Sequence, residues 1–335
     1  MGIIFSLFKN NSTINGNVTL QMAQNNDIYN TPMEYSDSDS ESECDYKSED
    51  TLSELFGMLM EEESIMTDEN SNNEEIDTQS DISTKNCFFT HDNTKTALLI
   101  GINYIRNNKA NDDLNGCIND VYNLQKMLKN NCHFEDNNIK TLLNGKASKE
   151  NIINEIERLV YFSHIHHNSE IWFSYSGHGG GKFSPNENDF QSEFICPSDY
   201  LKNGLIEDKW LRENFINKLH HTTKCFVIMD CCNSGSNLNL PYYYSDTYKN
   251  ECDESLCKII KISGSKDNQT SADYFDSESN SFQGALTNCF LKTISLNEDI
   301  LTHYLETKNI LKDRKFTQVP DLSYSDSKLI RYSLY

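Results

Sequence analysis

Two short apolar runs, each followed at once by small and polar residues, dominate the hydrophobic pattern of the chain. Residues 225–229 are apolar throughout and lead to Asp230, and Cys232 follows two positions later. Residues 171–175 are apolar apart from one serine, and they lead into a glycine-rich segment that contains His178. Uninterrupted runs of this length, rich in branched and aromatic side chains, predict buried strands of a parallel sheet.

From residue 95 onward, runs typical of strands alternate with segments of helical periodicity. Besides the two runs above, we expect strands at 96–104, 139–143 and 258–263, an edge strand at 328–332, and helices at 120–130, 148–161, 210–219, 281–295 and 303–313. Ser148 has the side chain of a helix cap. The cluster of three histidines at 164–167 is interpreted as the surface end of a helix rather than as a metal site. Strands that alternate with helices predict an α/β domain with a parallel sheet.

The residues that follow the two apolar runs predict a catalytic site. In an open parallel sheet, reactive groups lie beyond the carboxyl ends of the strands. If the two strands are neighbours, His178 and Cys232 therefore meet at one edge, as a cysteine nucleophile meets its base. Strand alternation places Asp230 and Cys232 on the same side, which favours Cys232 over Cys231 as the nucleophile. The alternative is a pair of buried structural thiols.

The formal net charge of −22 is distributed unevenly along the chain. Residues 1–94 contain 20 acidic and 3 basic residues, whereas the remainder contains 31 acidic and 26 basic ones. An acidic, serine-rich run such as 36–43 cannot bury a core, so we expect residues 1–94 to be a mostly disordered acidic leader. One apolar island at 52–60 could instead be a short helix that docks on a partner or on the catalytic domain. So acidic a chain lacks the basic surface that nucleic acid requires, which excludes nucleic acid as a partner.

Cysteine usage and the start of the chain bear on its location. The 11 cysteines have no paired spacing, and several lie in apolar runs, so we expect free thiols in a reducing cytoplasm. Neither a secretory signal nor a transmembrane run is apparent. Gly2 with Ser6 fits the N-myristoylation pattern, although an ordinary disordered start is the alternative. One acyl chain gives only marginal membrane binding, so any membrane association through Gly2 would be weak.

Six motifs occur in one order along the chain. They are Ala97–Tyr104, Leu114–Asp120, Tyr175–Gly179, Asp230–Gly235, Ile262–Asp273 and Gly284–Thr287. In sequence and order these motifs resemble those of the metacaspases, which are caspase-like cysteine peptidases, and the resemblance runs from about residue 96 to residue 329. It implies a caspase/hemoglobinase-like α/β fold with a mostly parallel six-stranded sheet flanked by helices.

The resemblance also implies roles for particular residues. His178 and Cys232 would form the catalytic dyad, and the backbone N–H groups of Gly179 and Cys232 would stabilise the oxyanion. The pocket for the substrate residue before the cleaved bond, the P1 pocket, would be lined by Cys117, Asp120, Ser176 and Asp230. Two carboxylates at the base of a pocket favour a cation, so cleavage after Arg or Lys is expected. Taken alone, Asp120 could equally be a charge at a helix N-terminus.

Many metacaspases carry a calcium site built from Asp side chains, and here the resemblance is incomplete. Asp208 matches one acid, Lys209 replaces its acidic neighbour, and Asn239 stands where another Asp is expected. Calcium affinity depends on the charge of the ligands. We therefore expect a weakened calcium site at Asp208 and Asn239, with Lys209 able to take the place of the ion, and no required cofactor.

The order of the motifs implies the type I arrangement of leader, large part and small part. The expected segments are a leader at 1–94 and a catalytic domain at 95–335, divided into a large-subunit part at about 95–236, a connector at about 237–257 and a small-subunit part at about 258–335. We expect a monomer that processes itself and cleaves protein or peptide substrates. Lys47 and Lys85 are candidate self-cleavage sites, with Lys85 favoured because it lies just before the domain. The alternative is a weakly active caspase-like scaffold whose acidic leader recruits partners.

Overall fold

The structure of the chain is a computed structural model, and the residues that it describes fall into ten segments. These are residues 18–20, 86–91, 93–105, 113–183, 190–232, 238, 240–244, 257–264, 273–294 and 298–335. They belong to one compact unit, which includes the whole central sheet. None of the helices in this part of the chain combines the length and the apolar character that a membrane span needs.

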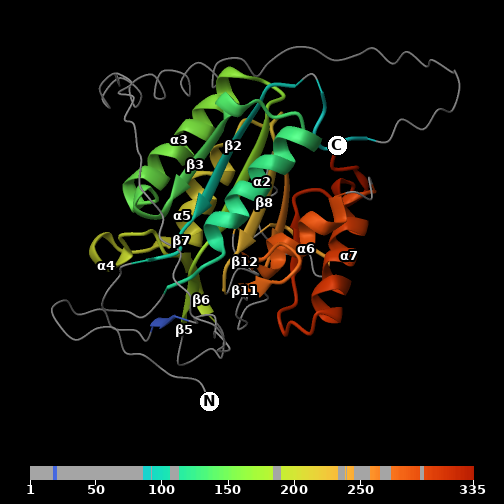
Figure 1. Ribbon diagram of the computed structural model, residues 1–335. Coiled ribbons are helices and arrows are strands. Elements are labelled where there is room, and N and C mark those ends of the chain that lie inside the picture. The colour runs from blue at the N-terminus through green and yellow to red at the C-terminus, as the bar shows by residue number, and fades with distance from the viewer. Residues whose placement is uncertain are drawn as a thin grey trace, which may run out of the picture. The chain divides into compact units, whose positions relative to one another are not determined.

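A mostly parallel sheet forms the centre of the unit (Figure 1). Its strands, in spatial order, are β3 (Ile139–Leu143), β2 (Lys95–Gly101), β4 (Glu170–Ser176), β8 (Lys224–Asp230), β10 (Lys258–Ser263), β13 (Asp321–Tyr324) and β9 (Tyr242–Tyr243). The first five strands run parallel, and β13 runs antiparallel to both β10 and β9. The predicted six-stranded, mostly parallel sheet is confirmed, and the two-residue β9 is added at its edge.

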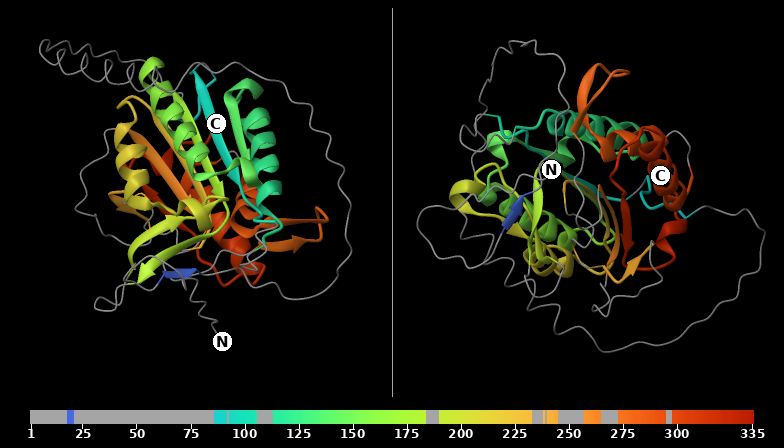
Figure 2. Two further views of the ribbon diagram at one scale, coloured as in Figure 1. Left: turned by 90° about the vertical axis from the view of Figure 1, so that its left-hand side faces the viewer. Right: turned by 90° about the horizontal axis from the view of Figure 1, so that it is seen from below.

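Helices flank both faces of the sheet (Figures 1 and 2). They are α2 (Cys117–Asn131), α3 (Lys149–Ile165), α4 (Tyr200–Asn203), α5 (Asp208–Asn214), α6 (Ala285–Thr293) and α7 (Ile300–Asp313). The cap predicted for α3 is present, because the Ser148 hydroxyl accepts the Asn151 N–H at 3.2 Å. The region predicted as a helix at 210–219 is α5 followed by a 3₁₀ turn at Ile216–Lys218.

The apolar core lies mainly between the sheet and the helices α2, α6 and α7. Leu124, Phe290 and Tyr304 from these helices join one cluster with the sheet residues Trp172 and Phe226, all of them buried. The rings of Trp172 and Phe226 stack at 4.6 Å across the neighbouring strands β4 and β8. This packing fixes the two strands whose ends carry the predicted catalytic residues.

Two smaller sheets lie at the carboxyl ends of the parallel strands (Figure 1). The first contains β1 (Val18–Leu20), β5 (Gly179–Phe183), β6 (Phe190–Ile195) and β7 (Ile206–Glu207) in that order, and β5 begins directly after His178. The second is a hairpin of β11 (Asp273–Asp276) and β12 (Ser281–Gly284), which projects from the unit in Figure 2.

The structure corrects two of the expected elements. The expected helix at 281–295 begins only at Ala285, because residues 281–284 pair with β11 and the rings of Phe275 and Phe282 meet across the two strands at 5.3 Å. The expected edge strand at 328–332 is wrong. Residues 329–331 form a 3₁₀ turn after Asp326, whose carboxylate accepts the Lys328 N–H, and the edge strand is β13 at 321–324.

The compact unit also begins earlier than residue 95, the expected start of the domain. Phe88 and Phe89 are buried, and their N–H groups donate to the carbonyls of Ser333 at 2.7 Å and Leu334 at 3.0 Å. Behind them, the fully buried Glu170 carboxylate accepts the Thr90 N–H at 2.9 Å. Residues 86–91 therefore belong to the catalytic domain rather than to the leader. Most of the expected connector at 237–257 lies outside the described residues.

Candidate active site

The structure brings the ends of strands β4 and β8 together in register. The two strands are parallel neighbours, and Ser176 pairs with Asp230 as the last pair of the ladder. His178 and Cys232 each follow that pair by two residues. A Cβ on Gly179 would lie 2.4 Å from the carbonyl oxygen of Cys232, so only a glycine allows the two segments to approach this closely. The expected meeting of the two strand ends is therefore present.

Two tyrosines hold the main chain of His178. The His178 N–H donates to the Tyr104 hydroxyl at 3.0 Å, and the His178 carbonyl accepts from the Tyr175 hydroxyl at 2.7 Å. The Tyr104 hydroxyl lies 2.9 Å from that of Tyr175 and donates to the Cys196 carbonyl. The His178 ring is almost fully buried and packs against the Tyr104 ring at 4.5 Å. The imidazole is thus fixed from its backbone and from one ring face.

Sequence reasoning missed this pair of tyrosines. The sequence predicts Tyr104 at the end of a strand, whereas in the structure it follows β2. Its backbone has a left-handed φ of 56°, and its ring packs against the His178 ring. Tyr175 lies inside a buried strand. One signal was present in the sequence, because a tyrosine within an apolar run must find a partner for its hydroxyl group.

Both cysteines at the end of β8 are buried, and Cys231 packs against the backbone of Gly179. The Cys231 Sγ lies 3.1 Å from the position that a Cβ on Gly179 would take. Burial raises the pKa of the Cys231 thiol well above its usual value, and the neighbouring Cys232 and Asp230 raise it further. Cys231 is therefore a protonated packing residue under the Gly179 backbone. This leaves Cys232, next in the chain, as the nucleophile candidate.

Asp120 and Asp230 converge on Gly284. A Cβ on Gly284 would lie 2.3 Å from the Asp230 Oδ2 and 2.5 Å from the Asp120 Oδ2. Asp120 also accepts the Ser176 hydroxyl at 2.6 Å and the Gly284 N–H at 2.9 Å. Asp230 accepts the N–H and the hydroxyl of Thr287, each at 2.9 Å. Three of the four residues expected in the P1 pocket are thus joined around one glycine of the β11–β12 hairpin.

Both carboxylates of this acid pair are buried. Burial raises the pKa of Asp120 well above its usual value, and the charge of Asp230 raises it further. Cys117, the fourth expected pocket residue, is also buried, and burial followed by the charge of Asp120 raises the pKa of its thiol. A cation in this place would relieve the repulsion between the two carboxylates.

The structure describes only part of the expected calcium site. Asp208 is buried, burial raises its pKa, and its Oδ1 has no hydrogen-bond partner among the described residues. The expectation that Lys209 takes the place of an ion is not met, because its side chain is 77% exposed and pairs with Glu213 at 3.8 Å. Within the described ranges, no three His, Cys, Asp or Glu side chains gather as metal ligands. Asn239, Gly2, Lys47 and Lys85 lie outside those ranges.

Comparison with known proteins places this site in a family. Residues 95–241 match the family description "Metacaspase, peptidase C14 domain". Metacaspase-3 of Trypanosoma brucei brucei is 30% identical to the chain over 261 residues, which cover 69% of the chain and 71% of that relative. The chain is a member of the metacaspase family. The expected family and its caspase-like fold are therefore confirmed.

Other relatives of this metacaspase are matched over smaller shares of their length. Metacaspase-1 of Candida albicans is 29% identical over 300 residues, and the chain spans 65% of it. Metacaspase-1 of Plasmodium falciparum is 32% identical over 197 residues, and the chain spans 32% of it. A solved structure from Geobacter sulfurreducens, 20% identical in sequence, superimposes with a TM-score of 0.54 over 72% of the chain and 97% of that structure. At that identity the likeness extends to the fold alone.

Proposed function

We propose that this metacaspase is a cysteine endopeptidase that cleaves after Arg or Lys through His178 and Cys232. One observation carries the proposal. The ladder between β4 and β8 ends at the pair Ser176 and Asp230. His178 and Cys232 therefore each follow the end of the ladder by two residues, next to the acid pair, because Ser176 also donates to Asp120. A nucleophile, a base and an anionic pocket within one small region are the parts that such a peptidase needs.

In the proposed reaction, His178 takes the proton of the Cys232 thiol, because the thiolate is the attacking form. The Cys232 sulfur then attacks the carbonyl carbon of the P1 residue, and the backbone N–H groups of Gly179 and Cys232 stabilise the oxyanion. His178 returns the proton to the leaving amine. Water, activated by the same imidazole, hydrolyses the thioester. Two hydrogen bonds support this role because they fix the backbone of His178. Its N–H donates to the Tyr104 hydroxyl, and its carbonyl accepts from the Tyr175 hydroxyl.

The preference for a basic P1 residue rests on Asp120 and Asp230. Both are buried, and their Oδ2 atoms face the same glycine, Gly284. A guanidinium offers two N–H donors on one side, so it can contact both carboxylates, whereas the Lys ammonium is a point charge between them. An Asp side chain in P1 would add a third negative charge to the pocket. Protein or peptide substrates with Arg or Lys at P1 follow from this chemistry.

No step of the proposed reaction uses a metal. Of the acids expected at the calcium site, the structure describes Asp208, and calcium binding usually needs several charged ligands. We propose that activity is independent of calcium and that the enzyme cleaves its own leader.

The enzyme is also proposed to act as a monomer. Its β13, the last long strand of the sheet, is paired on its outer side by β9 through Tyr324 with Tyr242 and Ser323 with Tyr243. Part of the edge that a second copy could extend is thus already covered.

The test is hydrolysis of fluorogenic peptides that differ only at P1. We expect cleavage after Arg and Lys, none after Asp or Leu, and covalent labelling of Cys232 by an arginyl chloromethyl ketone, all absent in Cys232→Ala. Cleavage after Asp or after apolar residues would overturn the pocket assignment. Absence of both cleavage and labelling in folded protein would favour the scaffold hypothesis.

A further inference from the structure

Helix α2, which carries two residues of the proposed P1 pocket, lacks a cap of its own. It begins at Cys117, and its N-cap position is Gly116, which has no side chain to accept the free N–H groups of the first turn. The first turn of a helix needs such an acceptor and favours negative charge. Asp120 is in that turn, but its carboxylate is engaged by Ser176 and by Gly284.

A carboxylate from the β11–β12 hairpin lies at this helix start. The Asp273 Oδ2 accepts the Asn115 N–H at 2.7 Å. A Cβ on Gly116 would lie 2.6 Å from the Asp273 Oδ1 and 2.6 Å from the backbone of Gln283, so the hairpin touches the helix start as closely as a glycine allows. Asp273 therefore holds, from 158 positions along the chain, the residue just before the N-cap of α2. Within the first turn, the Ile118 N–H donates to the Asn103 Oδ1 at 3.3 Å.

The same hairpin also contacts the acid pair. Asp273 and Gly284 are partners in the ladder between β11 and β12. The Gly284 N–H donates to the Asp120 Oδ1, and its Cα hydrogen faces both Asp120 and Asp230. One cross-strand pair of the hairpin thus touches both the start of α2 and the carboxylate that α2 presents to the pocket.

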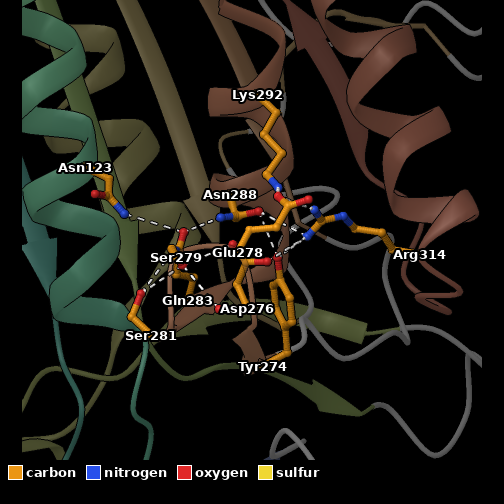
Figure 3. Close-up of polar contacts among 10 residues, drawn as sticks. All are labelled: Asn123, Tyr274, Asp276, Glu278, Ser279, Ser281, Gln283, Asn288, Lys292 and Arg314. Atoms are coloured by element: carbon orange, nitrogen blue, oxygen red, sulfur yellow. Dashed lines mark hydrogen bonds and ion pairs between the residues drawn. The ribbon is translucent and has the colours of Figure 1, made fainter.

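Ionic and hydrogen-bond contacts fix the other end of the hairpin to α6 and α7 (Figure 3). Arg314, just after α7, contacts Asp276 at 3.4 Å and Glu278 at 3.3 Å, and Glu278 also pairs with Lys292 on α6.

The Tyr274 hydroxyl donates to the Asn288 Oδ1 at 2.8 Å. Gln283, next to Gly284, bonds to Ser279 and Asn288, and Figure 3 shows these side chains converging from the hairpin and α6. Asp273 therefore belongs to a hairpin that contacts with α6 and with Arg314 hold in place.

We propose that Asp273 is a positioning residue for substrate recognition: its carboxylate holds the segment that leads into α2, so that Asp120 in the first turn faces the P1 cation together with Asp230. This inference rests on the proposed function. Asp273 acts through the Asn115 N–H and not by contact with the substrate. Burial raises the pKa of Asp273 to about 6, with the charge of Asp230 contributing, so the carboxylate is mostly an ionised acceptor at pH 7.

Two substitutions separate the hydrogen-bond role of Asp273 from its charge. Asp273→Ala removes the acceptor, and we expect KM for an Arg peptide to rise about fivefold, which corresponds to about 1 kcal/mol. The value of kcat should change by less than about twofold, because the dyad is untouched. Asp273→Asn keeps a side-chain oxygen as acceptor and should leave KM within about twofold of the wild type.

Asp299→Ala is the matched control. The Asp299 side chain caps α7 by accepting the Thr302 N–H at 2.8 Å, and α7 bears none of the proposed site residues. This variant should lose similar stability and keep the wild-type KM. An unchanged KM in Asp273→Ala would overturn the proposal. So would an equal rise of KM in Asp273→Asn, because the substrate would then respond to the charge of Asp273.

Hydrogen exchange provides a readout that does not need catalysis. Amide exchange at residues 115–120 should be faster in Asp273→Ala than in the wild type or in Asp299→Ala. Unchanged exchange there would also overturn the proposal. If the wild type cleaves no Arg peptide, the proposed function fails, and the exchange data still decide the role of Asp273. If Asp273→Ala does not fold, Asp273→Asn decides the question. A raised KM together with faster exchange at residues 115–120 in Asp273→Asn would contradict the proposal. Wild-type KM and wild-type exchange in that variant would support it.

Discussion

The ring of Tyr104 lies 4.5 Å from the ring of His178 and is tilted by 31° from it, while its hydroxyl accepts the His178 N–H at 3.0 Å. One residue thus supports the imidazole and anchors its backbone. The left-handed φ of Tyr104, 56°, makes both contacts available to a single side chain. A base held in this way loses little conformational freedom when it meets the thiol, which favours the proton transfer proposed above.

Tyr104→Phe should lower activity more than its effect on stability suggests. The substitution keeps the ring against His178 and removes a buried hydroxyl that donates to the Cys196 carbonyl. The Tyr175 hydroxyl, which donates to the His178 carbonyl, lies 3.0 Å from the Cys196 carbonyl. We expect a loss of about 1–2 kcal/mol in the free energy of unfolding and a fall of kcat by about tenfold. Urea titration and peptide hydrolysis measure the two effects.

Tyr304→Phe is the control for this substitution. Its hydroxyl is buried in α7 and donates to the Pro320 carbonyl at 3.1 Å, in the core rather than in the site. It should lose comparable stability with kcat unchanged. Equal falls of kcat in both variants would show that the Tyr104 hydroxyl acts only on stability.

Cys232→Ala should abolish peptide hydrolysis, whereas Cys231→Ala should retain most of it. Cys231 is a packing residue, so its truncation should cost about 1 kcal/mol of stability without removing a reacting group. Cys231→Leu, in contrast, should lower activity, because the Cys231 Sγ already lies 3.1 Å from the Cβ position of Gly179 and a larger side chain would displace that backbone. Cys225→Leu, in the interior of β8, controls for overpacking alone. A folded but inactive Cys231→Ala would disprove the choice of nucleophile.

Stability should depend on pH through the acids of the pocket. Burial raises the pKa of Asp273 to about 6, so the folded state holds this proton more tightly than the unfolded state does. The contribution of Asp273 to stability therefore falls as pH rises from about 4 to about 6, and changes little above that range. Relative to the wild type, the free energy of unfolding of Asp273→Asn should rise over the same interval by an amount on the order of 3 kcal/mol. The measurement is urea unfolding of both proteins at several pH values between 4 and 7.5.

Asp299→Asn should show the opposite sign. Burial opposes ionisation of Asp299, but the hydrogen bonds from Thr302 and the charge of Arg331 prevail and lower its pKa below the usual value. The stability that this group contributes is present above its unfolded pKa and is lost as pH falls. A difference between Asp273→Asn and the wild type that does not vary with pH would contradict the assigned pKa. The acid pair is present in both proteins, so the difference between them reports on Asp273 and its coupling to that pair.

The placement of the proposed dyad residues and of the acid pair could be predicted from the sequence because each follows from a local rule. A buried apolar run predicts a strand, parallel strands align their carboxyl ends, and residues two positions apart face the same side. These rules are sufficient to place three residues at one edge of the sheet, namely His178, Cys232 and Asp230. The family motifs then placed Asp120 and Ser176 beside them, and the hydrogen bond between these two residues at 2.6 Å agrees with that placement.

The supporting residues could not be predicted because their partners are far apart in the sequence. Asp273 lies in a polar stretch whose pattern is typical of a loop, and its partner Asn115 is 158 positions away. Tyr104 and Tyr175 read as strand residues, although their hydroxyl groups meet each other at 2.9 Å. Hairpin β11–β12 was missed for the same reason, since cross-strand contact between Phe275 and Phe282 overrides the apparent helical periodicity.

Calcium should have little effect on the wild-type enzyme. Lys209 and Asn239 replace acids at the expected site, and Asp208 is the one carboxylate that remains there. We expect activity in chelator and in millimolar calcium to agree within about twofold, and the double variant Lys209→Asp with Asn239→Asp to respond to calcium. Lys308→Asp, on the exposed face of α7, makes one of these charge changes elsewhere and should give no response. A wild type that needs calcium would show that other ligands complete the site.

Self-processing should release the leader without loss of the fold. We expect mass spectrometry of incubated protein to find new N-termini at Ser48 or Asn86, in chelator as well as in calcium, and not in Cys232→Ala. A cut after Lys85 leaves the Asn86 carbonyl bonded to the Ser333 N–H at 2.9 Å and leaves both buried phenylalanines in place.

Of the described residues, the cut separates only the three-residue β1, which pairs with β5, so the processed enzyme should unfold at nearly the same temperature as the full chain. Residues 86–335 expressed alone should fold and cleave Arg peptides, whereas residues 90–335 lack Phe88 and Phe89. Loss of one buried phenylalanine side chain typically costs about 3–5 kcal/mol, which approaches the whole stability of many domains. We expect the shorter chain to be unfolded or inactive. New N-termini downstream of Phe89 in active enzyme, or a stable 90–335 chain, would contradict the boundary at residue 86.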